Sequence, residues 1–155
     1  MITQEVLKEI FCYYPDTGLF VRRSGRYAGV AGSNTSRYVD VSIGNRMFQA
    51  HRLAWLYVYG SFPKGAIDHI NGDKRDNRLF NLREATRSEN GCNRGKGKAN
   101  SSGFKGVDLW CGKWRARIKK HGKSVFLGYF EIAEKAHEAY CDAAKEIHGN
   151  FHNGG

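Results

Sequence analysis

The sequence predicts an α+β protein with two folded parts. Residues 1–93 are expected to hold a small antiparallel sheet followed by a strand–strand–helix unit, and residues 104–155 a three-stranded antiparallel sheet packed on one helix. Alternating β-forming stretches and stretches with apolar residues at helical spacing occur in both parts. Between them, residues 94–103 are rich in glycine, serine and lysine, which is typical of a basic flexible linker.

The composition indicates a folded chain that binds a polyanion. Of the 155 residues, 41% are hydrophobic and 13% aromatic, which is enough for the core of one ordinary domain or two small ones. The formal net charge is +10, which by itself does not distinguish DNA from RNA or from a membrane surface. No apolar run is long enough to span a bilayer and the N-terminus lacks a signal-peptide pattern, so we expect an intracellular protein with no membrane partner.

The cysteines Cys12, Cys92, Cys111 and Cys141 form no C-x-x-C pair. A structural zinc held by two such pairs is therefore not expected. A disulfide framework is not expected either, because the rest of the sequence is typical of a cytosolic protein.

The elements of the first part follow from periodicity. Apolar residues at helical spacing predict a helix over residues 3–13. Strands of a small antiparallel sheet are expected at residues 19–21, 38–43 and 47–50. A second helix is expected to begin at Ala50 and to stop at Gly60.

Residues 66–94 collect a carboxylate, a histidine and several asparagines. A short apolar run leads into Asp68 and His69, and the turn pair Asn71-Gly72 follows. A second short strand is expected at residues 82–85. The stretch therefore predicts two strands that present polar side chains suited to metal-assisted chemistry.

A helix is expected directly after these strands. Thr86 and Glu89 have the T-x-x-E spacing of a capping box, which predicts a helix start at this point. That helix carries Asn90, with Asn93 about one turn further on.

This arrangement resembles the HNH endonuclease family, also called His-Me finger nucleases, in the phage and intron homing-type variant whose third letter is asparagine. The residues that carry the resemblance are Asp68-His69, Asn81 and Asn90. The resemblance implies a ββα-metal fold and hydrolysis of DNA to 3′-hydroxyl and 5′-phosphate ends. His69 is implied as the general base, and Asn81 as the residue that holds its imidazole through a side-chain or backbone oxygen.

The same resemblance implies one divalent cation, held by Asp68 and Asn90. Magnesium is expected, with manganese as a substitute, because Mg²⁺ prefers oxygen ligands and keeps several waters. Asn93 remains a rival to Asn90, since both are expected on nearby faces of one helix.

Several polar residues near the motif admit a simpler interpretation. Asp73, Asp76 and Asn77 are typical loop residues, although Asn77 or Arg78 could bind a phosphate. His51 could point at the active site or bind a phosphate, but we favour a structural role for a single histidine on an apolar helix.

Basic residues of this region are expected to contact DNA. They are Arg52, Arg78, Arg87, Arg94, Lys96 and Lys98.

Beyond the linker, strands are expected at residues 104–109, 113–120 and 124–130, followed by a helix with apolar residues from Ile132 to Ile147. This segment resembles the plant ethylene-response-factor (Apetala-type) DNA-binding domain. The residues that carry the resemblance are Gly106-Val107, Gly112-Lys113-Trp114, Ala116, Ile118, Leu127-Gly128-Tyr129-Phe130, Glu134-Lys135-Ala136, Ala139-Tyr140 and Ala143-Ala144. The resemblance implies that the sheet, and not the helix, enters the major groove.

Charge supports the same orientation. Residues 93–124 hold ten basic residues against one acid, whereas residues 125–155 hold two against five. The groove-facing residues are expected to be Lys105, Arg115, Arg117, Lys119, Ser124 and Phe126. Asp108 and Leu109 stand where the family usually has arginines, so the base preference of that family does not transfer to this chain.

The sequence thus predicts a metal-dependent DNA endonuclease of phage or mobile-element type. Double-stranded DNA is the expected partner, no small-molecule cofactor is expected, and the expected location is the cytoplasm and nucleoid of a bacterial host. A DNA-binding regulator with an inactive nuclease site is the first alternative. An RNA-binding protein that uses the same basic sheet is the second.

Overall fold

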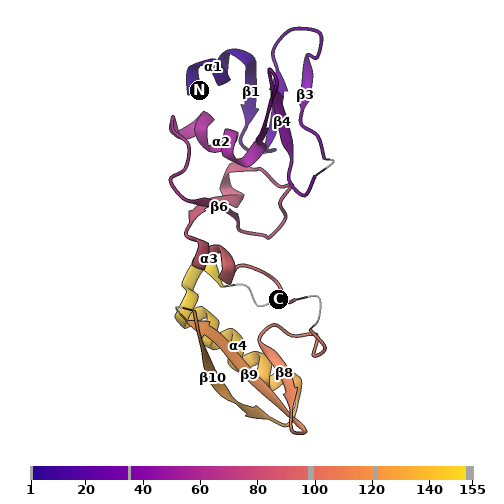
Figure 1. Cartoon of the computed structure of the whole chain (residues 1–155), viewed down its shortest axis with the longest axis vertical. Helices are drawn as coiled ribbons and strands as arrows, with labels where there is room; N and C mark the ends of the chain where they lie inside the picture. The colour runs from indigo at the N-terminus through magenta and orange to yellow at the C-terminus, as the bar shows by residue number, and fades with distance from the viewer. Residues whose placement is uncertain (1, 35, 98–99, 121, 153–155) are drawn as a thin grey trace. The chain divides into compact units, whose positions relative to one another are not determined.

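The computed structural model describes residues 2–34, 36–97, 100–120 and 122–152. The chain divides into two compact units, Met1–Ala85 and Thr86–Gly155 (Figure 1). The sequence predicted the end of the first domain at residue 93. In the structure the division falls after Ala85, and the helix that follows Thr86 belongs to the second unit. No helix among the described residues is long and apolar enough to cross a bilayer.

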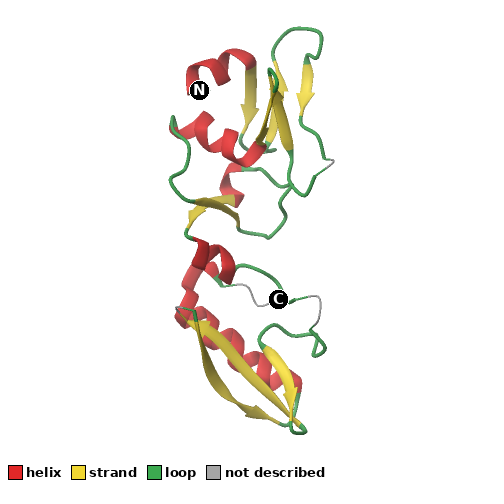
Figure 2. Ribbon diagram, in the orientation of Figure 1, coloured by secondary structure: helices red, strands yellow, loops and turns green. Residues whose placement is uncertain are grey.

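The described residues of the first unit form two α-helices and three small antiparallel sheets; Figure 2 shows these helices in red and the strands in yellow. The helices are α1 (Gln4–Ile10) and α2 (Ala50–Tyr59), with a 3-10 turn at Leu79–Asn81. The first sheet has the order β1 (Phe11–Tyr14), β2 (Leu19–Arg22), β3 (Gly29–Ala31). The other two are the pair β4 (Asp40–Ile43) and β5 (Arg46–Gln49), and the pair β6 (Ala66–His69) and β7 (Leu82–Ala85).

The N-terminal elements differ from the prediction in two respects. The helix ends at Ile10, and not at residue 13, because Phe11 and Tyr13 are buried while Tyr14 is exposed, which is the alternation of a strand. The strands expected in one sheet form two separate sheets, and the short strand β3 was not predicted. Gly60 ends α2 in a left-handed conformation, as predicted.

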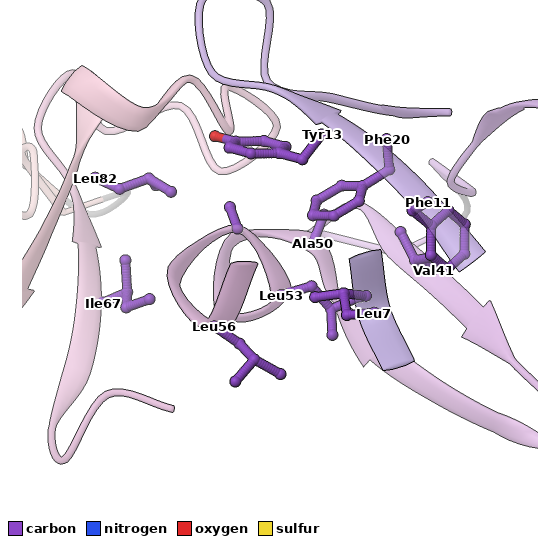
Figure 3. Packing of buried hydrophobic residues seen from close by; sticks show 11 residues of the cluster. Leu7, Phe11, Tyr13, Phe20, Val41, Ala50, Leu53, Leu56, Ile67 and Leu82 are labelled. Atoms are coloured by element: carbon purple, nitrogen blue, oxygen red, sulfur yellow. The ribbon is translucent and has the colours of Figure 1, made fainter. Parts of the chain in front are cut away.

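One apolar core holds the first unit together. Its fully buried members include Leu7 of α1, Phe11 of β1 and Leu53 of α2. Ile67 of β6 and Leu82 of β7 belong to the same core and point toward α2 (Figure 3). The β6–β7 hairpin is therefore anchored to α2 and to the N-terminal sheet by buried apolar surface, at about 1.5–3 kcal/mol for each large side chain.

The turn between β1 and β2 supports the loop between β6 and β7. The hydroxyl of Tyr13 donates to the backbone oxygen of Asn77 at 2.7 Å, and the backbone N–H of Leu79 donates to the oxygen of Pro15 at 2.9 Å. Gly18, with φ +73°, lies so close that a Cβ there would come 2.5 Å from the carbonyl carbon of Asn77. The N-terminal hairpin thus fixes the backbone of the loop at residue 77.

In the second unit, the part of the chain that the structure describes forms a short helix, one sheet and one long helix. Its elements are α3 (Arg87–Cys92), β8 (Val107–Trp110), β9 (Lys113–Lys120), β10 (Lys123–Phe130), α4 (Ala133–His148) and a 3-10 turn at Gly149–Phe151. The strands are antiparallel in the order β10-β9-β8. The capping box predicted at the start of α3 is confirmed, since Thr86 and Glu89 each bond the backbone N–H of the other.

The sheet packs on α4 as predicted. Ala116 and Ile118 of β9 are buried with Ala136 and Tyr140 of α4, and the small alanines allow close approach. Ile132 is half exposed because it is the N-cap of α4 and not a core position.

The expected linker is tied to the second unit at its C-terminal end. The Ser102 hydroxyl lies within hydrogen-bond distance of the backbone oxygens of Phe104 and Val107. The side-chain amide of Asn100 donates to the backbone oxygen of Phe104. Lys98, expected to contact DNA, lies outside the described residues.

We expect Gly18→Ala to lower the free energy of unfolding far more than the matched control Gly44→Ala. Both glycines have positive φ, which costs about 1–2 kcal/mol for an L-residue. Only at Gly18 does the new methyl group meet backbone atoms, whereas nothing lies within 4 Å at Gly44. The overpacking adds about 1–3 kcal/mol at Gly18. Urea denaturation of both variants measures the difference, and equal losses would contradict the role given to the turn.

Candidate active site

Strand β6 delivers Asp68 and His69 to the site. In its antiparallel pairing with β7, Asp68 lies opposite Arg83 and His69 opposite Leu82. The side chains of Asp68 and His69 are each only 4% exposed. Because Ile67 and Leu82 are part of the core, these two polar residues have little freedom to move.

The imidazole of His69 faces the side chain of Asn77. Its Nε2 lies 3.5 Å from Oδ1 of Asn77, a residue that is itself 4% exposed. The Asn77 amide nitrogen donates to the backbone oxygen of Arg75 at 3.1 Å, which orients Oδ1 toward the ring. An acceptor at Nε2 favours the neutral tautomer with its proton on Nε2, and this assignment leaves the lone pair on Nδ1.

Asn81, which was expected to hold the imidazole, makes different contacts. Its Oδ1 accepts from the backbone N–H of Asn71 at 3.0 Å, and its Nδ2 donates to Asn71 Oδ1 at 3.0 Å and to the Asp76 oxygen at 2.8 Å. Its backbone oxygen accepts from Ile70 at 2.9 Å. Asn81 therefore closes the loop that contains Asn77, and the amide beside the ring is that of Asn77.

Burial lowers the pKa of His69 below its ordinary value. The hydrogen bond to Asn77 and the charge of Asp68 act in the opposite direction, but they do not offset the loss of hydration. The imidazole is consequently neutral near neutral pH and able to accept a proton.

Two further aromatic side chains surround His69. The ring of His51, on α2, lies 5.0 Å from that of His69 at an interplanar angle of 76°. The ring of Tyr38 lies 5.1 Å from His51 and 6.2 Å from His69. The sequence favoured a structural role for His51 and did not single out Tyr38, because only the fold brings α2 and the segment before β4 to the end of β6.

Asp68 is held by Arg83, which was not among the site residues expected from the sequence. Arg83 donates to Oδ2 of Asp68 from Nε at 2.9 Å and from Nη2 at 2.6 Å. The carboxylate side chain is 4% exposed and the guanidinium side chain 16%. The register of β6 against β7 was the signal that could have found this pair, since it puts the two residues opposite each other.

The amide candidates for the metal lie on the other compact unit. Asn90 is half-buried within α3, and Asn93 is the C-cap residue and is 5% exposed. Asp68 belongs to the first unit and both asparagines to the second.

The DNA-contact candidates of the first unit have partners within the protein. Arg78 donates to Asp76 from Nε at 2.7 Å and from Nη2 at 2.5 Å, and its guanidinium lies over the ring of Phe80. The Arg78 side chain lowers the pKa of Asp76 to about 2. Arg52 lies over the ring of Phe62 at 5.8 Å.

One face of the β10-β9-β8 sheet carries most of the predicted groove residues. Arg117 pairs with Phe126 and Lys119 with Ser124 across β9 and β10, and Arg115 pairs with Asp108 across β8 and β9. Cross-strand partners share a face, so these side chains lie opposite the buried residues Ala116 and Ile118.

Asp108 holds two arginines on this face. It accepts from Arg115 at 2.6 Å and from Arg117 at 3.0 Å. The Arg115 guanidinium also stacks on Trp110 at 4.4 Å. Asp108 of β8 therefore bonds two arginines of the neighbouring strand β9.

The remaining basic candidates lie elsewhere in the second unit. A cavity of about 580 Å³ is lined by Arg87, Arg94 and Lys105, together with Arg117 and Lys119. Lys105 donates to the backbone oxygen of Cys92 at 2.7 Å, and burial lowers its pKa. Lys96 donates to the oxygen of Gly103 at 2.9 Å.

The segment that contains these site residues matches a known protein family. Residues 48–92 match the model of a family described as HNH endonuclease, and this range contains Asp68, His69, Asn81 and Asn90. Protein 3.8 of Escherichia phage T7 is 34% identical over 105 residues, which cover 65% of this chain and 85% of that protein. An uncharacterized HNH endonuclease of Acanthamoeba polyphaga mimivirus is 32% identical over 106 residues, 66% of this chain and 54% of the viral protein.

A plant protein also shows local similarity. Dehydration-responsive element-binding protein 2A of Arabidopsis thaliana is 41% identical over 68 residues, which cover 40% of this chain and 20% of the plant protein. No solved structure matches the chain.

The buried imidazoles predict a dependence of stability on pH. Burial first, and then the neighbouring His69 and Arg52, lower the pKa of His51 from 6.5 to about 3. As the pH falls below about 6.5, the unfolded chain takes up a proton that the folded chain does not, so folding is destabilised. Between about pH 7 and about pH 5, wild type should lose about 2 kcal/mol more than His51→Leu. Urea denaturation at the two pH values measures this, and parallel losses in both proteins would contradict it.

Proposed function

The chain belongs to the HNH endonuclease family, a family of nucleases, and on this basis we propose that it hydrolyses phosphodiester bonds of double-stranded DNA with His69 as the general base. The observation that carries the proposal is the buried His69 with Nε2 facing Asn77, within the residues that match the family. We also propose a homing-type enzyme that acts in the cytoplasm, at the nucleoid of a bacterial host; the observation in favour of a phage origin is the similarity to protein 3.8 of Escherichia phage T7.

The proposed chemistry uses the tautomer that Asn77 favours. Nδ1 of His69 takes a proton from a water molecule, and the water oxygen attacks the scissile phosphorus. The bond from phosphorus to the 3′ oxygen breaks, the leaving oxygen takes a proton from solvent, and the products are 3′-hydroxyl and 5′-phosphate ends. Because burial lowers the pKa of His69, the ring is neutral and ready to act near neutral pH.

We further propose that Asp68 and Asn90 bind one divalent cation, Mg²⁺ or Mn²⁺. Carboxylate and amide oxygens are the hard ligands that such an ion prefers, and Arg83 orients the Asp68 carboxylate within the first unit. A cation bound there would stabilise the charge that develops on the phosphate oxygens. Asn93, which is buried at the end of α3, remains the rival ligand.

The second unit is proposed to position the nuclease on DNA through its basic sheet face. Arg115 and Arg117 lie on the same face and both bond Asp108, and arginine is the side chain that most often recognises guanine by two hydrogen bonds. The name of the plant relative describes binding to a response element, and this supports a DNA-binding role for the related segment. A DNA-binding regulator without cleavage is the alternative, and it predicts binding with no hydrolysis.

We expect wild-type protein to cut supercoiled plasmid in the presence of magnesium and not after chelation. His69→Ala should cut about 10² to 10⁴ times more slowly, the usual contribution of a general base, while binding DNA with nearly unchanged affinity. His152→Ala, which removes an exposed histidine, serves as the control. Wild-type protein that binds duplex DNA tightly but never cuts it would establish the regulator instead, and a His69→Ala variant of full activity would remove His69 from the mechanism.

Manganese binding tests the proposed ligands without requiring turnover. Asp68→Asn, which keeps the side-chain shape, should weaken the binding of Mn²⁺ measured by calorimetry, because it removes a charged ligand. Asn90→Ala should weaken it as well, and Asn93→Ala should not. The opposite result for the two asparagines would transfer the ligand role to Asn93. Melting curves of each variant control for loss of fold, since breaking the ion pair leaves Arg83 without its carboxylate.

The salt dependence of DNA binding separates two roles for Arg117. If the side chain reads a base, Arg117→Ala should cost about 1–3 kcal/mol on a preferred site and little on random duplex. If it contacts phosphate, affinity should fall on every sequence and the log–log salt slope should lose about 0.9. Because Arg117 lies on the predicted groove face and shares Asp108 with Arg115, we expect the first result in the full-length protein. Lys135→Ala, on α4, is the control, and an equal loss there would exclude the sheet face.

A further inference from the structure

His51 lies in the first turn of α2, and its ring is next to that of His69, the candidate base. Its side chain is 4% exposed, and its ring packs edge-to-face on His69 with the centroids 5.0 Å apart. Tyr38 covers both rings, and the ammonium group of Lys74 lies 5.2 Å from the Tyr38 ring centroid. The two imidazole rings therefore pack against each other and against Tyr38 at the end of β6.

The Nδ1 atom of His51 is buried and has no hydrogen-bond partner among the described residues. Buried polar atoms in native proteins are nearly always hydrogen-bonded, so an exception requires an explanation. Packing alone does not supply one, because a leucine fills a similar space and leaves no polar atom unsatisfied. The unsatisfied nitrogen of His51 therefore lowers the free energy of unfolding of the protein without substrate.

His51 also differs from His69 in its contacts. His69 has the Asn77 amide oxygen 3.5 Å from its Nε2 and Asp68 as its neighbour in the strand. Among the described residues His51 has neither an acid nor an amide oxygen as partner, and burial, His69 and Arg52 all lower its pKa. It therefore stays neutral when His69 becomes charged, and it can accept a hydrogen bond without competing for the proton.

We propose that His51 is a second catalytic histidine, whose Nδ1 accepts a hydrogen bond from the water that attacks the phosphorus. The inference rests on the proposed nuclease function. One proton of the water passes to Nδ1 of His69, and the other stays on the oxygen and is held by His51. The bond from oxygen to phosphorus forms as the bond to the 3′ oxygen breaks, and His51 gains and loses no proton. Contacts of this kind are often unformed without substrate and tighten when it binds.

The role of His51 predicts a specific pair of variants. His51→Leu keeps an apolar group of similar size but loses the nitrogen, and His51→Asn keeps a polar atom near the position of Nδ1. We expect His51→Leu to lower kcat about 10- to 100-fold, the size of one hydrogen bond to a reacting atom, with KM unchanged. His51→Asn should recover most of this loss. His152→Asn, at an exposed histidine of the second unit, is the control for removal of an imidazole and should keep the wild-type kcat.

A second measurement separates catalysis from folding. The melting temperature of the full-length protein, taken with chelator and without DNA, should be equal or higher for His51→Leu, because the unsatisfied nitrogen is gone. A stable His51→Leu protein with lower kcat that Asn restores supports the proposal. Wild-type kcat in His51→Leu, a raised KM with unchanged kcat, or a loss of kcat that parallels a lower melting temperature would each overturn it. If wild-type protein itself does not cut DNA, the proposed nuclease function fails, and that failure is visible before any His51 variant is compared.

Discussion

The hydrogen bond from the Tyr13 hydroxyl to the backbone oxygen of Asn77 is the contact on which the candidate site depends. The loop between β6 and β7 is polar and has no core of its own, so its position must be imposed by neighbouring elements. Burial raises the pKa of Tyr13, which keeps the hydroxyl protonated and able to donate. The same bond brings the Asn77 side chain to His69. The N-terminal sheet is thus a support for the base and not an independent module.

Charged groups with expected functions are already paired within the protein. Asp68 is bonded to Arg83 in a nearly buried pair, whereas the pair of Asp76 and Arg78 is more exposed and contributes little to stability. Asp108 binds two arginines of β9, Arg115 in a partly buried pair and Arg117 in a pair that is exposed on both sides. A ligand that reaches Asp68 meets a nearly buried side chain that Arg83 already orients, which lowers the entropy lost on binding. The same pairing means that a phosphate or a cation must share or displace an existing partner.

The local elements of the fold could be predicted from the sequence, because they follow from periodicity and capping. Strand β9, the stop of α2 at Gly60 and the capping box at Thr86 agree with the structure. The contacts of the site could not be predicted in this way. Asn77 stands in a run of turn-forming residues, and His51 is 18 residues from His69 in sequence, so only tertiary packing distinguishes them from ordinary loop and core residues.

Burial and the Asn77 amide together hold His69 neutral, with its proton on Nε2 and its lone pair on Nδ1. Long-range ¹H–¹⁵N spectra of histidine-labelled full-length protein near pH 7 measure this directly, with the His69 signals assigned by their loss in His69→Asn. We expect a protonated Nε2 and an unprotonated Nδ1, and we expect Asn77→Ala to weaken that preference because it removes the acceptor. A His69 ring that is doubly protonated, or neutral with its proton on Nδ1, would contradict the account.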